Sequence, residues 1–212
     1  MIKKIRKTII FMLSGIMICG LMGCGENELE ETAFPLLAAV DYDDEQNKVV
    51  YCNSFSRPKS ESGEGEELPY AARKGDNFAR AKEDYEDLLQ RVPDYNHLKI
   101  LLLGEDLVNN KQVYRDMIAT LAETEEFPRN TYICITEDIS DILEIVDKLP
   151  EDVGSYLENY LENHKQKEDN LISLGDLIDE QENQNLILYA PYFEVEDNIV
   201  YMRGEYALEF YD

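Results

Sequence analysis

Apolar residues recur with two different periods along the chain, and each period predicts its own kind of element. Residues 33–40 and 49–55 are apolar runs with β-branched and aromatic residues, and the polar segment 41–48 between them predicts a hairpin turn. The Ser-, Gly- and Glu-rich segment 56–69 has no period at all. We therefore expect residues 56–69 to form a mobile surface loop.

From Phe78 onward the apolar period becomes that of an amphipathic helix. This first stripe contains Phe78, Ala81, Tyr85, Leu88, Leu89 and Val92, and Pro93 ends it. Residues 97–103 then form a nearly continuous apolar run closed by Gly104, typical of a central strand covered on both faces, with Leu101 pointing inward. Three more stripes predict helices: Val113, Met117, Ile118 and Leu121; Ile139, Ile142, Leu143 and Val146; and Val153, Tyr156, Leu157, Tyr160, Leu161 and His164.

The rest of the pattern completes a mixed architecture. Ser173 is a suitable N-cap for a short helix through Leu174, Leu177 and Ile178. Strand-like runs occupy residues 132–136, 186–195 and 199–210, and a turn at 196–198 separates the last two. This order predicts an α+β fold with α/β-like alternation: a mixed central β-sheet with packed helices, in a single globular domain over residues 33–212.

The N-terminus has the three zones of a secretory signal. Lys3, Lys4, Arg6 and Lys7 precede an apolar run from residue 9 to 22, and Leu21-Met22-Gly23-Cys24 resembles a lipobox. We predict a lipoprotein signal peptide over residues 1–23, diacylglyceryl attachment to Cys24, and an acidic tether over residues 24–32. An uncleaved membrane helix is the alternative, but it needs about 20 apolar residues, and this run is shorter and interrupted by Ser14, Gly15 and Gly20.

The net charge of the chain limits the kinds of partner that electrostatic attraction can bind. The whole chain has 20 basic and 45 acidic residues. Its first 23 residues hold four basic residues and no acidic one, which leaves 16 basic against 45 acidic residues and a net charge of −29. Such a surface is repelled by nucleic acid and by anionic lipid headgroups. Electrostatics cannot hold this domain at a membrane, so we expect the lipid on Cys24 to do so, because two acyl chains give stable anchoring.

Few residues suggest reaction chemistry. The chain lacks a phosphate-binding Gly-rich loop and a G-x-S-x-G elbow. Its two histidines, His97 and His164, lie far apart, and Glu168 one turn after His164 gives only two ligands where zinc needs three or four. We therefore predict no catalytic residue, no cofactor and no metal. Cys52 and Cys134 each lie in a β-type run, which favours buried free thiols, although a disulfide between them stays open.

Two acidic clusters have simpler explanations than a site. Asp41, Asp43 and Glu45 alternate as in the start of a calcium loop, but Gln46 replaces the required glycine and Cys52 the final glutamate. A solvated hairpin turn is the better interpretation. The acidic residues within 83–87 occupy the polar face of an amphipathic helix, where a solvated face is the default. The many tyrosines of the second half could line a recognition surface, but we expect most of them to pack in the core or at its rim.

Several short motifs, in order, resemble the spore-germination receptor C subunit, the Ger(x)C family of lipoproteins. The segment Glu28-Leu29-Glu30-Glu31 after the lipobox cysteine resembles the family's opening. Residues 75–81 (GDNFARA) resemble the glycine-led start of its first helix, and residues 97–107 (HLKILLLGEDL) resemble its most recognisable strand. Residues 129–133, 142–143, 155–157 and 174–177 continue in register.

The resemblance implies a non-enzymatic, membrane-anchored subunit on the extracytoplasmic face of the cell or spore inner membrane. Such a subunit acts with a polytopic B subunit and an A subunit in nutrient-triggered germination. Only Cys24 corresponds to a family residue with an assigned chemical role. Family members continue beyond the segment that residues 199–210 resemble, so we expect an N-terminal-domain homologue. The alternative function is a free-standing lipoprotein that binds a small ligand or peptide.

Overall fold

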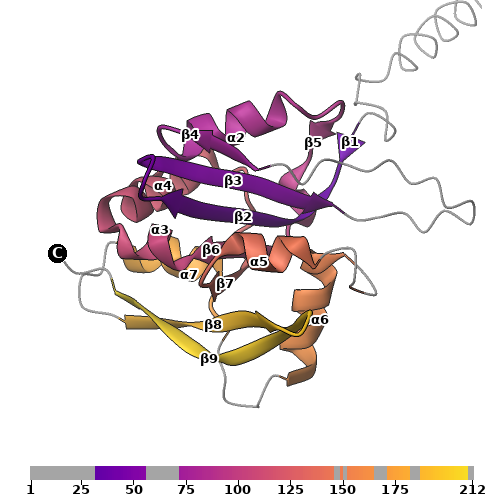
Figure 1. The fold of residues 1–212 in the computed structure, drawn as a ribbon. Helices are drawn as coiled ribbons and strands as arrows, with labels where there is room; N and C mark the ends of the chain where they lie inside the picture. The colour runs from indigo at the N-terminus through magenta and orange to yellow at the C-terminus, as the bar shows by residue number, and fades with distance from the viewer. Residues whose placement is uncertain are drawn as a thin grey trace, which may run out of the picture. The chain divides into compact units, whose positions relative to one another are not determined.

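A computed structural model describes residues 32–55, 72–145, 149, 152–164, 171–181 and 187–209 (Figure 1). Contacts along the chain separate residues 1–32 from residues 33–212, and the fold below is that of the second part. The predicted signal peptide and the predicted loop at residues 56–69 lie outside the described residues.

A seven-stranded mixed sheet forms the centre of the fold, in the order β4-β3-β2-β6-β7-β8-β9. Strands β2, β6, β7 and β8 run parallel, whereas β3 and β4 on one side and β9 on the other pair antiparallel with their neighbours. The predicted mixed sheet is confirmed. The strands are β2 (Pro35–Asp43), β3 (Lys48–Phe55), β4 (Arg73–Gly75), β6 (Ile100–Gly104), β7 (Tyr132–Thr136), β8 (Ile187–Glu196) and β9 (Ile199–Glu209).

Helices cover both faces of this sheet, in agreement with the predicted α/β-like alternation. They are α2 (Phe78–Glu86), α3 (Glu105–Asn109), α4 (Lys111–Thr124), α5 (Ile139–Glu144), α6 (Val153–His164) and α7 (Leu174–Gln181). Tyr51 of β3 contacts Tyr85 of α2, with ring centroids 5.6 Å apart, and Phe193 of β8 contacts Tyr160 of α6 from the opposite face. Helix α5 shares the face of α6, while α3 shares that of α2 and α4 packs on both α2 and α3.

Strand β6 lies at the centre, and each of its residues is buried, as is typical of a strand covered on both faces. The predicted burial of Leu101 is confirmed. The predicted start at His97 is wrong, because Tyr95–His97 form a 3₁₀ turn. The carboxylate of Asp94 caps this turn by accepting the N–H of Asn96 (2.9 Å).

Helix α2 is shorter than its apolar stripe predicts. It ends at Glu86, and Leu88 and Val92 are exposed. Its buried residues are Phe78, Ala81 and Tyr85, which face β3 and β4. After Glu86 the chain forms a turn and continues as β5 (Val92–Pro93). Directly after β5, the Asp94 N–H donates to the carbonyl of Ala33 in β1 (Thr32–Ala33).

A buried polar network joins α2 to β3. The Tyr51 hydroxyl donates to Asn53 Oδ1 (2.7 Å) and lies 3.2 Å from the Tyr95 hydroxyl, which donates to Glu86 Oε1 (2.6 Å). Lys82 pairs with Glu86 (2.8 Å), so the last carboxylate of the network is compensated. Because its members bond one another, the network is compatible with burial.

The β2–β3 hairpin is present as predicted, but its turn is shorter. Strand β2 continues through Asp43, so the turn begins at Asp44, three residues later than the predicted start at Asp41. Asn47 has φ 53°, and Asp43 Oδ1 accepts the N–H of Gln46 (2.9 Å). The correction matters because it places Asp41 inside the sheet rather than in solvent.

The question of a disulfide between Cys52 and Cys134 is answered by the register of the strands. Cys52 pairs with Ala39, Ala39 with Leu102, and Leu102 with Cys134. Three strand spacings therefore separate the two cysteines, about 14 Å in all, twice the Cα–Cα reach of a disulfide. Both thiols are free and buried, and burial raises the pKa of Cys52 to about 12.

The predicted β8–β9 hairpin is confirmed within one residue at each end. Its loop consists of Asp197 and Asn198, with φ of 53° and 61°. Two consecutive positive φ angles give a turn whose twist matches the twist of the flanking strands. Across the hairpin, Tyr192 pairs with Gly204 and Phe193 with Met202, so Arg203 is an extra residue that forms a bulge in β9.

Candidate functional site

Cys24, the predicted lipidation residue, lies outside the described residues, so its attachment to lipid stays a prediction. Within the part of the chain that the structure describes, no helix has the length and hydropathy needed to cross a membrane.

The carboxyl ends of the parallel strands are the first place to look for a site, because open α/β sheets bind ligands there. Such binding uses the crevice formed where the order of the strands reverses. Here β2, β6, β7 and β8 follow one another across the sheet in chain order. The order of these described strands contains no reversal, so it does not predict that crevice.

Asp41 is nevertheless an unusual group at this edge. It lies near the end of β2 with only 8% of its surface exposed. Its carboxylate accepts the N–H of Tyr42 (2.8 Å) and the N–H of Ile139 at the start of α5 (3.5 Å). Gly104 at the end of β6 provides the space, since a Cβ there would lie 2.0 Å from the Asp41 carboxyl carbon.

Burial raises the pKa of the Asp41 carboxyl to about 6, against the lowering effect of the two N–H groups. The nearby carboxylates of Asp138 and Asp106 raise the pKa further. Asp41 therefore changes its charge in the mildly acidic range. Its carboxylate is held by the backbone N–H groups of Tyr42 and Ile139, a geometry that supports a structural role joining β2 to the start of α5.

The other acidic residues considered from the sequence do not converge on Asp41. Asp43 is bound by Lys74, whose hydrogen bond lowers the pKa of the Asp43 carboxyl, and Glu45 is exposed in the turn. The carboxylates of α2 pair with basic residues on the same helix: Arg80 with Glu83 (2.9 Å) and with Asp84 (2.6 Å), besides Lys82 with Glu86.

Metal-binding residue types are dispersed in the same way. His97 is exposed, and its ring meets Phe34 edge-on at 5.4 Å. His164 ends α6, and Glu168, which we had considered beside it, lies outside the described residues. Among the residues described, no group of three or more His, Cys, Asp and Glu residues is arranged to hold a metal ion.

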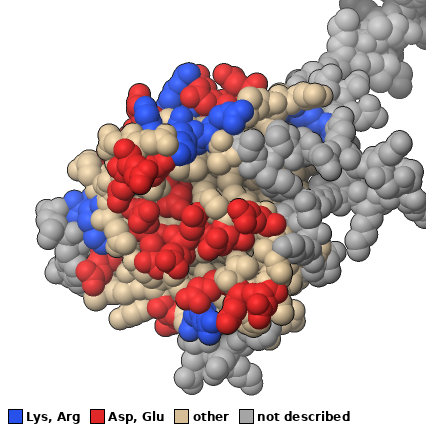
Figure 2. Space-filling view, in the orientation of Figure 1, with Lys and Arg blue, Asp and Glu red and all other residues tan. Residues whose placement is uncertain are grey.

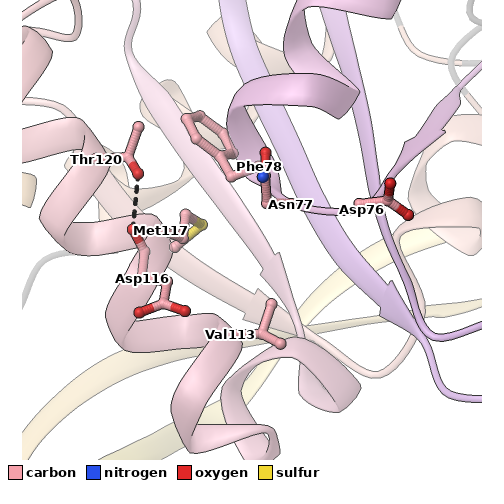
Figure 3. A pocket seen from close by; sticks show the side chains of 7 residues that line it. All are labelled: Asp76, Asn77, Phe78, Val113, Asp116, Met117 and Thr120. Carbon is pink, nitrogen blue, oxygen red and sulfur yellow. Dashed lines mark hydrogen bonds between the residues drawn. The ribbon is translucent and has the colours of Figure 1, made fainter.

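One hollow opens between the start of α2 and the middle of α4 (Figure 3). Its volume is about 60 Å³, and its lining combines apolar Phe78, Val113 and Met117 with polar Asp76, Asn77, Asp116 and Thr120. Lys48 already pairs with Asp76, and Gln112 donates to Asp116 (2.9 Å). Small-molecule sites usually measure about 300–1,000 Å³, so this hollow accommodates a side-chain tip rather than a metabolite.

Surface charge is distributed unevenly. Figure 2 shows acidic side chains gathered across the middle of one face, over α3 and α5, with basic side chains above them over β4 and α2. Glu105, Asp106 and Asp141 lie in the first turns of α3 and α5, and Asp138 caps α5, where carboxylates are stabilised by the free N–H groups of the helix start. Part of this acidic patch is therefore explained by helix capping.

Apolar exposure is concentrated elsewhere, on the β8–β9 hairpin. Ile199 is 49% exposed and Tyr189 51%, and Tyr201 and Met202 are exposed as well. We had expected most tyrosines of the second half to pack in the core or at its rim. Tyr156, Tyr160, Tyr192 and Tyr206 do pack there, whereas Tyr189 and Tyr201 lie on the surface. The alternating pattern of residues 199–210 indicates that one face of this strand is exposed, but the sequence does not show which face the helices leave uncovered.

Comparison with known proteins gives one result. The family model described as "Spore germination protein N-terminal domain" matches residues 25–195, which extend over every element from β1 to α7 and nearly all of β8. No curated protein matches the chain, and no solved structure does.

Proposed function

Because the chain belongs to the family of spore germination protein N-terminal domains, we propose that it is a lipid-anchored, extracytoplasmic interaction subunit of a germinant receptor. The family match over residues 25–195 is the observation that carries this proposal. Membership makes the chain a spore germination protein of the receptor C-subunit type and suggests a membrane-associated location. Anchoring, partner and mode of action are the proposed parts.

Anchoring through Cys24 is supported by the sequence around it and by charge. The lipobox-like segment 21–24 follows a basic start and an apolar run. The acidic remainder is repelled by anionic headgroups, so a covalent lipid supplies the membrane affinity that the protein surface lacks.

The proposed partner is a polytopic membrane subunit of the same receptor, together with its other subunits. A lipid anchor confines the domain to the membrane surface and raises its effective concentration there. Even a weak interface is then occupied. The hollow between α2 and α4 is small for a metabolite, so binding of a free small ligand, the alternative function, gains no support from it.

A cysteine-replacement experiment tests the proposal. Cys24→Ala should release the domain from membranes or leave it unprocessed, and should abolish cross-linking to a polytopic membrane protein in sporulating cells. Cys19→Ala is a matched control, since it makes the same change five residues earlier within the signal. The proposal fails if Cys24→Ala fractionates and cross-links as the wild type does, or if the tethered wild type is recovered alone.

A further inference from the structure

The outer edge of β9 is an unpaired border of the sheet. Strand β9 is eleven residues long and pairs on one side with β8, and no described strand pairs with its other side. At the opposite border, β4 has only three residues. A long edge strand presents a row of backbone N–H and C=O groups that can add another strand, and proteins usually shorten or cover such edges.

The first half of this edge is apolar. Ile199, Tyr201 and Met202 are all exposed, and Tyr201 and Met202 project to opposite faces of the strand. An added strand would cover these side chains on both faces. About half of the Ile199 surface and over a third of that of Tyr201 and Met202 remain uncovered, and this apolar area gains nothing from burial within the domain.

The second half of the edge is acidic. Glu205 and Glu209 are exposed and lie on one face of the strand, since they are four residues apart beyond the bulge. The one basic residue of the hairpin, Arg203, is already paired with Glu194 (2.9 Å) and Glu196 (2.7 Å). Lys111 donates to the backbone carbonyl of Glu209 (2.9 Å). The side chains of Glu205 and Glu209 are exposed, so cations of a partner can reach them.

We propose that the outer edge of β9 binds an extended segment of a partner protein by strand addition. Backbone hydrogen bonds supply the affinity in this mode, and alternate side chains supply the specificity. The segment carries apolar residues opposite Ile199–Met202 and Lys or Arg opposite Glu205 and Glu209. This inference rests on the proposed function, because it names the surface through which the domain docks and the chemistry of the segment that it recognises.

Charge argues for a foreign segment over a second copy of the chain. The chain carries a net charge of −25, so bringing two copies edge to edge sets like charges against each other. A basic segment does not meet this obstacle.

Titration of the full chain with synthetic peptides tests the inference. The probe is a ten-residue peptide that alternates Val and Thr in one half and Lys and Thr in the other, together with its reversed sequence, so that both strand directions are sampled. Binding should protect backbone amides of β9 from hydrogen exchange. A peptide methylated at alternate backbone nitrogens should not bind, because it lacks the donors of a strand, and a peptide with Glu for Lys should bind more weakly.

Charge-reversal variants distinguish binding at the β9 edge from general electrostatic attraction to the acidic chain. The double variant Glu205→Lys/Glu209→Lys should weaken binding roughly tenfold, as expected when two cross-strand pairs turn from attractive to repulsive. Asp87→Lys/Glu123→Lys makes the same change in net charge at exposed positions near the ends of α2 and α4, and should change affinity less than about twofold. An apolar pair, Ile199→Ser/Met202→Ser, should weaken binding where Leu88→Ser/Val92→Ser does not.

Several outcomes would overturn the inference. Equal loss of binding in both charge variants would show non-specific attraction, and binding of the methylated peptide would exclude strand addition. A dimer in sedimentation that Ile199→Ser/Met202→Ser dissolves would assign the edge to a second copy. If Cys24-dependent recovery of a membrane protein holds while the peptide titrations fail, this inference falls and the proposed function stands. If recovery itself fails for the wild type, the proposed function falls.

Discussion

The centre of the sheet and its β9 border follow opposite rules of composition. In β6 each residue is buried, and β2 and β7 on either side are almost as closed. In β9 only Val200 and Leu208 are buried, although Ile199, Tyr201 and Met202 are equally apolar. At the centre, apolar residues are explained by folding alone. At the β9 border, folding does not explain why the exposed residues are apolar. We therefore expect the border to have a role in function.

The largest contrast should come from placing the same charge in both regions. Leu101→Asp buries a carboxylate without a partner in β6 and should cost about 4 kcal/mol or more of unfolding free energy. Tyr201→Asp in β9 should cost several times less, because over a third of the Tyr201 surface is already exposed. Thermal and urea unfolding followed by circular dichroism measure both. Equal melting of the two variants would contradict the contrast.

A smaller effect should come from the close contact between β2 and β6. Gly104→Ala places a Cβ 2.0 Å from the Asp41 carboxyl carbon and should cost about 3 kcal/mol through overpacking. The backbone of Gly104 (φ −76°, ψ 152°) suits any residue, so the cost is steric. In an Asp41→Ala background the same substitution should cost less than about 1 kcal/mol. Additive losses in this double-mutant cycle would show that the two residues do not meet.

The two aspartates of β2 should give opposite dependences on pH. Burial raises the pKa of Asp41 to about 6, so its contribution to stability is complete below the unfolded pKa near 4 and is lost as pH rises through 6. Asp41→Asn should remove this slope, which amounts to about 2–3 kcal/mol between pH 4 and 7. Asp43 has a lowered pKa because of Lys74, so its contribution is present at neutral pH and lost on acidification.

Urea unfolding at several pH values compares Asp41→Asn with Asp43→Asn. The difference between wild type and Asp41→Asn should grow in favour of the variant as pH rises from 4 to 7. The difference for Asp43→Asn should change in the reverse sense. A wild-type slope that Asp41→Asn leaves intact would mean that another group titrates in this range.

The smallest effect should come from trimming the border. Ile199→Ser should change stability by less than about 0.5 kcal/mol, since nearly half of its surface is already exposed. Leu102→Ser in β6 is the comparison, and it should lose several times more because the site is closed. The midpoints of urea unfolding, measured in parallel, compare the two variants. A large loss of stability in Ile199→Ser would indicate that the border is part of the core.

Much of this fold is predictable from the sequence because its elements have clear periods. The continuous run through Leu101 gives the central strand, and the alternation around residues 196–198 gives the β8–β9 hairpin. Predictions fail where tertiary contacts override the pattern. The stripe through Val92 outlasts α2, because the chain turns away from β3 after Glu86. Strand β4 has three residues and helix α3 has five, too few for a strand-type or helix-type apolar period to be recognised in the sequence.

The candidate surfaces were less predictable than the fold. Asp41 was placed in a solvated turn, although it follows the apolar Ala38-Ala39-Val40, which could have suggested a longer strand. Its carboxyl packs against Gly104, more than 60 residues away in sequence, and no local pattern encodes that contact. Exposure of Tyr201 likewise depends on where the helices stop covering the sheet.

The topology also has a consequence for the rate of folding. Strands β2 and β3 meet across a short turn, whereas β2 must find β6 by bringing Leu37 to Ile100, and β7 must find β8 by bringing Ile135 to Tyr192. Each of these long closures costs chain entropy before the contact stabilises anything, and parallel pairings of this kind slow folding. The two hairpins should therefore form early, and the rate-limiting step should be the docking of β6 between β2 and β7.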